Sequence, residues 1–429
     1  MSNPQMHDTL EKWGLRTDRW YAYPPLASLV LGSWLRVFGV SAAALFAFQI
    51  LLNCCVQLCL FWICRRLQLH ALWPLALGLI FFLGTLVWGM RPEPQSFLCL
   101  LLGVAFLLGA PLPNLFASSF FLSMAGAMSP QAGLFAAPLL VASLATGRWR
   151  DATWPERSRD LLLFASGLLV TAGLFHLSIG GQWTDFLSDF RKHLSIGVGG
   201  GQSRLDLLLS YFHWMTFGVE WLRAIAILGA LVLIALALAS RGKWRSKLYP
   251  IALLLGVLAT LVTSIPAGYR LHLLFNGLFL AVALSLPLFR SDAIRLTWLW
   301  PAAITALCLL PALPELAAHL FRERDNRQAI QQDLLSLQGR PVYCDSAVAW
   351  FVYGWQLPGS VQSLQLTNKF ALVPLRPGAV TIIPESDVNN RSLRIMGHTF
   401  RSTSLNSRTW RIVPVPAEPP KSQGQEPPQ

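Results

Sequence analysis

The feature that most constrains this chain is an alternation of long apolar runs with short basic clusters between residues 41 and 320. A helix needs about 20 consecutive apolar residues to cross roughly 30 Å of hydrocarbon. Ten runs meet or approach this length, at 41–64, 71–90, 95–109, 113–128, 131–145, 159–179, 221–239, 248–266, 271–289 and 296–317. Three early runs are short, so partial crossings or bent helix pairs are alternatives there. The pattern predicts an all-α polytopic membrane domain.

The composition agrees with a membrane location and argues against a nucleic-acid partner. Only 13% of residues are charged, about half the share of an ordinary soluble domain. The net charge of +13 comes from cations in separate clusters, whereas a nucleic-acid footprint forms one contiguous basic face. Membrane lipid is therefore the expected surrounding, and no nucleic acid is expected.

The basic clusters also predict the orientation of the helices, because cytoplasmic loops of membrane proteins carry an excess of Lys and Arg. The clusters fall at every second major turn, at 65–66, 148–159, 241–247 and 290–295. Placing all of them inside puts residues 1–40, 91–94, 180–220, 266–270 and everything after 321 outside. Segment 24–40 (PPLASLVLGSWLRVFGV) is short, must begin and end outside, and carries Trp34 and Arg36. We therefore expect it to form an amphipathic helix in the outer interface.

The character of the chain changes after residue 321. Residues 322–338 are charged and helix-prone, and 341–345, 379–383 and 409–415 have the β-branched and aromatic pattern of strands. These segments predict a small C-terminal α/β soluble domain over 321–415, followed by a disordered Pro/Gln-rich tail at 416–429. The predicted organisation is thus an outer loop and interfacial helix at 1–40, the membrane domain at 41–320, this domain and the tail.

Most polar groups that could carry chemistry fall on the outer side. An ionisable residue near bilayer depth is costly and is a functional candidate by default. Each candidate also has a structural alternative: Glu93 could cap the helix expected near Gln95, and Asp8 could be an ordinary solvated residue. Arg270 and His272 could form an interfacial anchor with Tyr269. The glycine run at 197–201 lacks the Lys-Ser/Thr ending of a P-loop, and no disulfide framework or metal-type Cys/His spacing appears.

Short motifs in the first hundred residues carry a family resemblance. The segment 21–26 (YAYPPL), the pair Phe38–Gly39, and a long apolar run ending in Arg65 and Arg66 resemble the start of GT-C-type glycosyltransferases. That superfamily includes the aminoarabinose transferases of lipid A and the protein O-mannosyltransferases. The segment 91–94 (RPEP) is similar to the family's Arg-Pro-Asp or Asp-Pro element at the outer end of a later span. A soluble C-terminal domain outside the membrane is also common in the family.

The resemblance implies an enzyme that moves a sugar from a polyprenyl-phosphate carrier to a glycan, lipid or protein acceptor at the outer face. Asp8, sixteen residues before Pro24, is the best-placed candidate for the catalytic carboxylate that takes the acceptor proton. Glu93 falls where the family often has a second functional acid. It could hold a sugar hydroxyl, orient Arg91 or help bind a divalent cation such as Mg²⁺ or Mn²⁺, and no other cofactor is expected.

The remaining candidates are substrate-binding residues. A lipid phosphate needs cations near the interface, and the candidates for this role are Arg91 and Arg270, then Arg191 and Lys192. Beside Arg270 lies His272, and Tyr23 is placed to stack on a sugar. The expected location is the bacterial inner membrane with the C-terminal domain in the periplasm.

The chain departs from the family pattern in two respects. Family members begin with a transmembrane helix before the first outer loop, and their acid is often followed by Glu, whereas Thr9 follows Asp8 here. Either the true start lies upstream or this copy is degenerate. A transporter or flippase of a lipid-linked glycan, an outer-face polysaccharide polymerase or ligase, and a non-catalytic degenerate transferase are the alternative functions. A transporter would place charged residues at mid-membrane in corresponding halves, and no clear internal repeat is present.

Overall fold

The computed structural model describes ten stretches of the helical region and five strands. The described residues are 24–39, 42–88, 92–109, 114–146, 153–197, 221–240, 244–263, 268–289, 298–310, 313, 342–344, 361–363, 380–384, 399–401 and 409–414. The chain divides into two compact units. The larger unit comprises Tyr21–Phe38 and Phe46–Ala312 and contains the helices apart from the first residues of α3 (Ala42–Arg66), and the other includes Gly39–Leu45 and Leu313–Gln429 and contains the strands.

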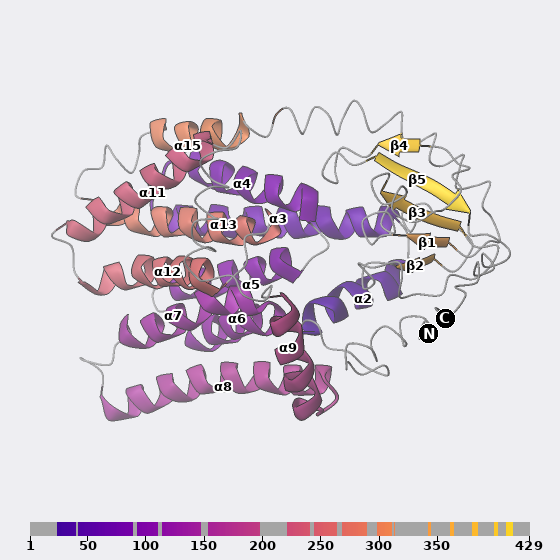
Figure 1. Ribbon diagram of the computed structural model, residues 1–429. Coiled ribbons are helices and arrows are strands. Elements are labelled where there is room, and N and C mark those ends of the chain that lie inside the picture. Colours follow the sequence, from indigo (N-terminus) through magenta and orange to yellow (C-terminus); the bar gives the residue numbers. More distant parts are fainter. Residues whose placement is uncertain are drawn as a thin grey trace, which may run out of the picture. The chain divides into compact units, whose positions relative to one another are not determined.

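Every apolar run predicted from the sequence holds a helix (Figure 1). These helices are α3 (Ala42–Arg66), α4 (Leu72–Trp88), α5 (Pro92–Leu107), α6 (Leu115–Met128), α7 (Pro130–Thr146), α8 (Trp154–Ser178), α11 (Trp221–Ala239), α12 (Trp244–Thr263), α13 (Gly268–Ser285) and α15 (Leu299–Leu309). A 3-10 turn, η2 (Leu286–Leu288), follows α13. Among the described residues, three helical segments are long and apolar enough to cross a membrane by length and composition, Ala43–Arg66, Trp154–Ser178 and Ser246–Thr263.

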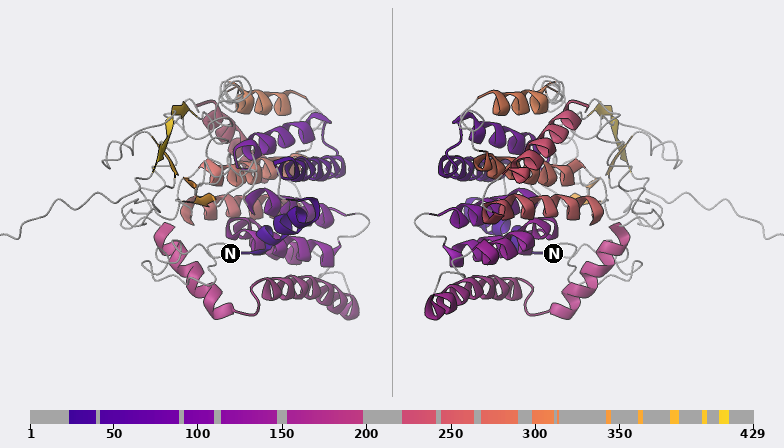
Figure 2. Two further views of the ribbon diagram at one scale, coloured as in Figure 1. Left: turned by 90° about the vertical axis from the view of Figure 1, so that its right-hand side faces the viewer. Right: turned by 90° about the vertical axis from the view of Figure 1, so that its left-hand side faces the viewer.

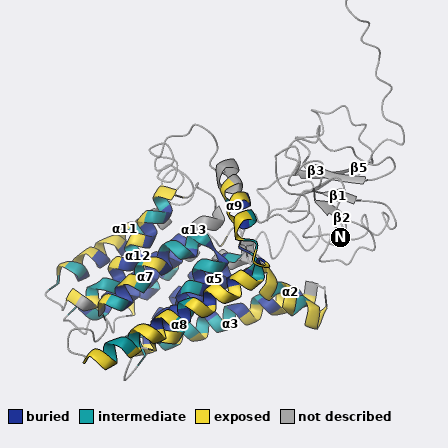
Figure 3. Cartoon of the chain, turned by 90° about the horizontal axis from the view of Figure 1, so that it is seen from below, coloured by how far each residue is buried: buried dark blue, intermediate teal, exposed yellow. Residues whose placement is uncertain are grey.

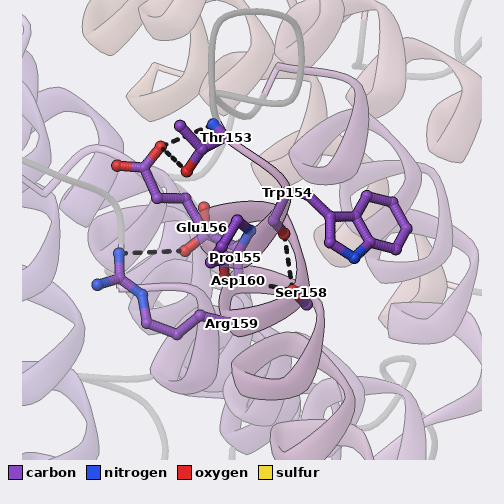
Figure 4. A network of polar contacts seen from close by, with 7 residues as sticks. All are labelled: Thr153, Trp154, Pro155, Glu156, Ser158, Arg159 and Asp160. Carbon is purple, nitrogen blue, oxygen red and sulfur yellow. Dashed lines mark hydrogen bonds and ion pairs between the residues drawn. The ribbon is translucent and has the colours of Figure 1, made fainter.

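Helix α8 starts at Trp154 rather than at the expected residue 159, and its first turn explains the difference (Figure 4). Glu156 Oε2 accepts hydrogen bonds from the backbone N–H and the hydroxyl of Thr153, at 2.9 and 3.0 Å. The bond from the Thr153 N–H pairs a backbone donor at the helix start that has no partner within the helix. Arg159 pairs with Asp160 at 3.6 Å. The helix therefore extends beyond its apolar part, and Arg159 belongs to the helix rather than to a loop.

The core of the larger unit is built around α13, which contacts α4, α5, α7, α11 and α12. Its residues from Leu273 to Ser285 are buried (Figure 3). Phe135 of α7 is fully buried and lies against two helix glycines, Gly256 of α12 and Gly277 of α13. Glycine at both positions lets the three helices approach closely around one aromatic ring, as small residues commonly do in membrane bundles.

Helix α8 lies at the edge of the bundle and presents an apolar face outward. Leu162 and Leu169 are each 70% exposed, in a helix of mostly apolar residues. A soluble protein would rarely leave such a continuous apolar face uncovered. Three exposed tryptophans, Trp154, Trp244 and Trp298, lie at the starts of α8, α12 and α15. Each of these helix starts follows a basic cluster. Tryptophan at the end of a membrane helix is typical of the membrane interface.

The contact between α6 and α8 is a close, hydrogen-bonded seam. Ser119 Oγ donates to Phe164 O at 2.9 Å, and Ser123 Oγ donates to Thr171 Oγ1 at 2.7 Å. A methyl group added at Gly167 would lie 2.6 Å from Phe116 O and 2.8 Å from Phe120 N, both backbone atoms of α6. The seam therefore needs a glycine at this position.

Replacing Gly167 with Ala is expected to destabilise the protein by about 1–3 kcal/mol, because the backbone of α6 cannot move aside without disturbing its packing. Gly173, on the same helix, is the matched control, since an added methyl group there meets nothing within 4 Å. Thermal unfolding in detergent compares the two variants. Equal melting temperatures for Gly167→Ala and Gly173→Ala would contradict the close approach of α6 and α8.

The second unit contains a five-stranded sheet in the order β2-β1-β3-β5-β4. The strands are β1 (Val342–Cys344), β2 (Val361–Ser363), β3 (Val380–Pro384), β4 (Thr399–Arg401) and β5 (Thr409–Pro414). The pairs β1–β2 and β1–β3 are parallel, with Val342 opposite Val361 and Val380, whereas β5 is antiparallel to β3 and β4. The three predicted strands are confirmed, and β2 and β4 were not predicted. The expected helix at 322–338 and the tail at 416–429 lie outside the described residues.

Candidate functional site at the outer end of the helix bundle

We call one end of the helix bundle the outer end, because the basic clusters predict that it faces away from the cytoplasm. Helices α5 and α7 begin there, and α6 and α8 finish there. A further helix, α2 (Leu26–Phe38), occupies the segment expected to form an interfacial helix, and it contacts α5, α6 and α8. Leu29, Val37 and Phe38 are exposed, and Arg36 lies in its last turn. This apolar and cationic surface suits a membrane interface.

A second helix at this end, α9 (Trp183–Gly197), was not predicted. The chain turns sharply after α8 through Gly180 and Gly181, which have φ of 60° and 76°, a conformation that glycine adopts at little cost. Trp183 Nε1 donates to His176 Nδ1 at 2.8 Å, and the ring of Phe186 lies edge-on to Phe175 with centroids 5.1 Å apart. These contacts fix α9 at an angle to α8 (Figure 2).

An open groove of about 390 Å³ lies between α6, α8 and α9. Its lining is mostly apolar and comprises Pro24, Ser123, Gly126, Ala127, Pro130, Leu168, Thr171, Ala172, Phe175, Trp183, Phe186 and Phe190. The polar members Ser123 and Thr171 satisfy each other across the seam between α6 and α8. The groove therefore offers an apolar surface to its contents, which suits a hydrocarbon chain.

Glu93 lies in the first turn of α5 and is 7% exposed. The helix begins at Pro92, three residues before the start expected near Gln95, so Glu93 lies in the first turn, where the helix dipole favours a carboxylate as the capping alternative supposed. A helix N-terminus favours a carboxylate by about 0.3–1 kcal/mol, whereas burying an ionised carboxylate costs several kcal/mol. The role of Glu93 in the site stays a prediction.

A second buried acid lies on α9. Asp189 is 1% exposed, and it shares the inward face of the helix with Phe186 and Phe190. These three positions are three and four residues apart, the spacing that places side chains on one helix face. Among the described residues, Glu93 and Asp189 are the charged side chains that are buried. Asp185 on the same helix is half-buried, so burial distinguishes Asp189 from this neighbouring acid.

The other predicted site residues divide into three groups. Arg191 is on α9 and exposed. The backbones of Lys192, Arg270 and His272 lie in α9 and in the first turns of α13, while their side chains lie outside the described ones. Asp8, Tyr23 and Arg91 lie outside the described residues. Helix α13 contacts α5, and both begin at the outer end. Glu93 and Arg270 therefore lie in the first turns of neighbouring helices.

The described part of the chain contains no group of three His, Cys, Asp or Glu side chains placed to hold a metal ion. The divalent cation expected near Glu93 stays a prediction. What the arrangement offers chemically is an apolar groove for a hydrocarbon chain, two buried carboxylates in helices of the outer end, and cationic residues on α9 and α13.

The fold is similar to that of a protein of known structure. Neither a protein-family model nor a curated protein sequence matches the chain. Among solved structures, ArnT from Cupriavidus metallidurans bound to undecaprenyl phosphate is similar, with a TM-score of 0.56 and 13% identity, over 95% of this chain and 92% of that chain. ArnT in the apo state is similar over the same shares, with a TM-score of 0.52 and 12% identity.

The protein is thus a multi-pass membrane protein with the fold of ArnT. This confirms the many-helix architecture predicted from the apolar runs. It also confirms, at the level of the fold, the resemblance to GT-C-type glycosyltransferases inferred from the YAYPPL and RPEP motifs.

Proposed function

We propose that this protein is a glycosyltransferase that moves a sugar from a polyprenyl-phosphate carrier to an acceptor at the outer face of the membrane. One observation carries the proposal: an apolar groove opens at the outer end of a bundle whose fold is that of ArnT, and a structure of ArnT contains undecaprenyl phosphate. The groove has the apolar lining that a polyprenyl chain requires.

The proposed reaction is a displacement at the anomeric carbon of the sugar. The acceptor oxygen forms a bond to that carbon as the bond to the phosphate oxygen breaks, and polyprenyl phosphate leaves with the electron pair. Asp8 takes the proton from the acceptor hydroxyl, because a neutral hydroxyl is a weak nucleophile. Glu93 holds a sugar hydroxyl, and a divalent cation at Glu93 is the alternative role.

Cationic side chains stabilise the leaving phosphate in this proposal. Arg91 and Arg270 are the first candidates, with Arg191 and Lys192 as further ones, since guanidinium and ammonium groups bind phosphate oxygens through charge-assisted hydrogen bonds. Tyr23 and His272 contribute to the sugar site. We further propose the bacterial inner membrane as the location, with 321–415 forming a soluble α/β domain in the periplasm and the boundaries at 40, 320 and 415.

The proposal is tested by incubating the protein in native lipid with a panel of polyprenyl-phosphate sugars and a crude acceptor extract. Mass spectrometry follows the free polyprenyl phosphate. Wild-type protein is expected to release it from at least one donor, and only when acceptor is present. A folded protein that releases none from any donor would overturn the proposed function.

A further inference from the structure

Four aromatic rings form a continuous row along the groove. Phe175 of α8 lies between Trp183 and Phe186 of α9, at centroid distances of 5.3 and 5.1 Å. Phe190 stacks on Phe186, with centroids 5.6 Å apart, and all four rings line the groove. Trp183 stands at one end of the row and is 40% exposed, so packing within the row holds it less firmly than the buried ring of Phe186.

A hydrogen bond to His176, in the last turn of α8, holds this end of the row. Of the four rings, only the indole of Trp183 carries a hydrogen-bond donor, and its Nε1 donates to His176 Nδ1 at 2.8 Å. The imidazole itself lies against the turn between the two helices, since a methyl group added at Gly181 would be 3.3 Å from His176 Cε1. The bond therefore ties the exposed end of the aromatic row to α8.

This hydrogen bond requires a neutral imidazole. The indole N–H only donates, and both nitrogens of a protonated histidine also donate, so a charged His176 has no nitrogen that accepts the bond. The requirement holds whichever way the imidazole ring is turned. Histidine is the side chain that ordinarily changes its charge between about pH 5 and 8, and His176 is exposed at the outer end of α8. The bond is therefore present at neutral pH and is lost as the pH falls.

The elements packed against His176 carry a limited set of ionisable groups. Helix α6 has none, α2 contributes Arg36, and the others on α8 lie in its first two turns. Those on α9 are Asp185, Asp189, Arg191, Lys192 and His193. Among the described side chains, none forms an ion pair with His176. The bond to Trp183 is thus the polar side-chain contact that protonation of the imidazole breaks.

We propose that His176 is a positioning residue that holds Trp183 in the groove wall while its imidazole is neutral, so that the groove binds a polyprenyl chain at neutral pH and releases it more readily in acid. The inference deepens the proposed function and rests on it for the identity of the hydrocarbon chain. Because α9 lies at the outer end of the bundle, the relevant pH is that outside the cytoplasm. His176 takes no part in the transfer step itself.

The test measures the binding of polyprenol, which has the hydrocarbon chain of the proposed carrier and a hydroxyl group that does not ionise over this pH range. The protein is labelled with 5-fluorotryptophan, and fluorine NMR follows the resonance of Trp183, identified as the one missing from Trp183→Phe. Polyprenol is titrated in detergent at about pH 7.5 and about pH 5, on either side of the usual charge change of histidine. Wild-type protein is expected to bind it about three- to tenfold more weakly at the lower pH, the effect of losing one hydrogen bond.

Two substitutions at His176 separate positioning from general packing. Asparagine keeps an acceptor oxygen close to the position of Nδ1 and does not gain a proton, so His176→Asn is expected to bind polyprenol at both pH values as the wild type does at neutral pH. His176→Leu removes the acceptor and is expected to bind weakly at both. Thermal unfolding of each variant distinguishes a loosened groove from a lost fold.

His70→Asn is the matched control. His70 Nδ1 also accepts a hydrogen bond, from the backbone N–H of Leu72 at 3.2 Å. It lies in the turn before α4, which the basic clusters place at the opposite end of the bundle from the groove. This variant is expected to keep the pH dependence of the wild type, because its acceptor does not contact the groove wall.

Each outcome decides the inference separately from the proposed function. Equal affinity of the wild type at both pH values, no binding at either, or a pH dependence that persists in His176→Asn overturns the role of His176 even if sugar transfer is observed. Failure of both His176 variants to fold makes His176 a structural residue and also overturns it. A pH dependence that requires His176, in a protein that transfers no sugar from any donor, supports the positioning role and overturns the transferase.

Discussion

Replacing Glu93 with Gln is expected to lower the rate of sugar transfer by about 100-fold or more while the protein stays folded. Glutamine keeps the size of the side chain and removes its charge. A carboxylate that works as an acid, a base or a positioned hydrogen-bond acceptor typically contributes about 10²–10⁴-fold to a rate. Glu93 is buried in the first turn of α5, and thermal unfolding of the variant separates a lost rate from a lost fold.

The control for this variant is a second glutamate in a first helical turn. Glu156 accepts two hydrogen bonds from Thr153 at the start of α8, which begins at the end of the bundle away from the groove. Glu156→Gln is expected to lose about 0.3–1 kcal/mol of stability, because the amide oxygen still accepts these bonds and only the attraction of a charge to the helix start is lost, and to keep its transfer rate. Release of polyprenyl phosphate and thermal unfolding are measured for both variants. A Glu93→Gln enzyme with the wild-type rate would show that Glu93 is only a helix-start residue.

Adding one methyl group at Gly256 is expected to be the most damaging small change in the bundle core. The new carbon would lie 2.5 Å from Phe135 Cδ1 and 2.9 Å from Phe135 Cα. Phe135 is fully buried, so neither its ring nor its backbone has space to move. Gly256→Ala is therefore expected to lower stability by about 3 kcal/mol, the upper part of the range for overpacked cores.

Gly277 gives an informative comparison, because the three atoms nearest to its added methyl group all belong to the ring of Phe135, with Cζ at 2.9 Å. Replacing the Phe135 ring with the smaller leucine side chain is expected to restore most of the stability lost in Gly277→Ala and less of the stability lost in Gly256→Ala. Gly229→Ala in α11 is the control, since nothing lies within 4 Å of its added methyl group. Thermal unfolding in detergent ranks the variants, and a Gly256→Ala protein as stable as Gly229→Ala would disprove this packing.

The helices of the bundle were predictable because apolar length is a local property of the sequence. Each predicted run holds a helix, and 221–239 was predicted to the residue. The errors occur where polar residues extend a helix beyond its apolar part, as Thr153 and Glu156 do for α8. In the sheet, β1 is as short as β2 and β4, at three residues each, but its residues (VYC) are all β-branched, aromatic or apolar, whereas β2 (VQS) and β4 (TFR) are mostly polar.

The site was less predictable, because it depends on which helix ends meet. Phe186 and Phe190, with Trp183 preceding them, have the spacing of one helix face, and this signal could have revealed α9. The polar residues between them and the following glycine run made 180–220 look like a loop. Glu93 was identified from the RPEP motif, whereas the burial of Asp189 depends on how α9 folds back on α8 and leaves no trace in the local sequence.

The most direct test of the transferase proposal asks whether the bond between the sugar and the carrier breaks. Purified protein is reconstituted in proteoliposomes with a polyprenyl-phosphate sugar and acceptor, and mass spectrometry quantifies intact donor, free polyprenyl phosphate and glycosylated acceptor. Wild-type protein is expected to form the last two in equal amounts, and Asp8→Asn is expected to form neither. Donor that reaches the opposite leaflet intact, with no free polyprenyl phosphate, would contradict the transferase and favour a transporter of the lipid-linked sugar.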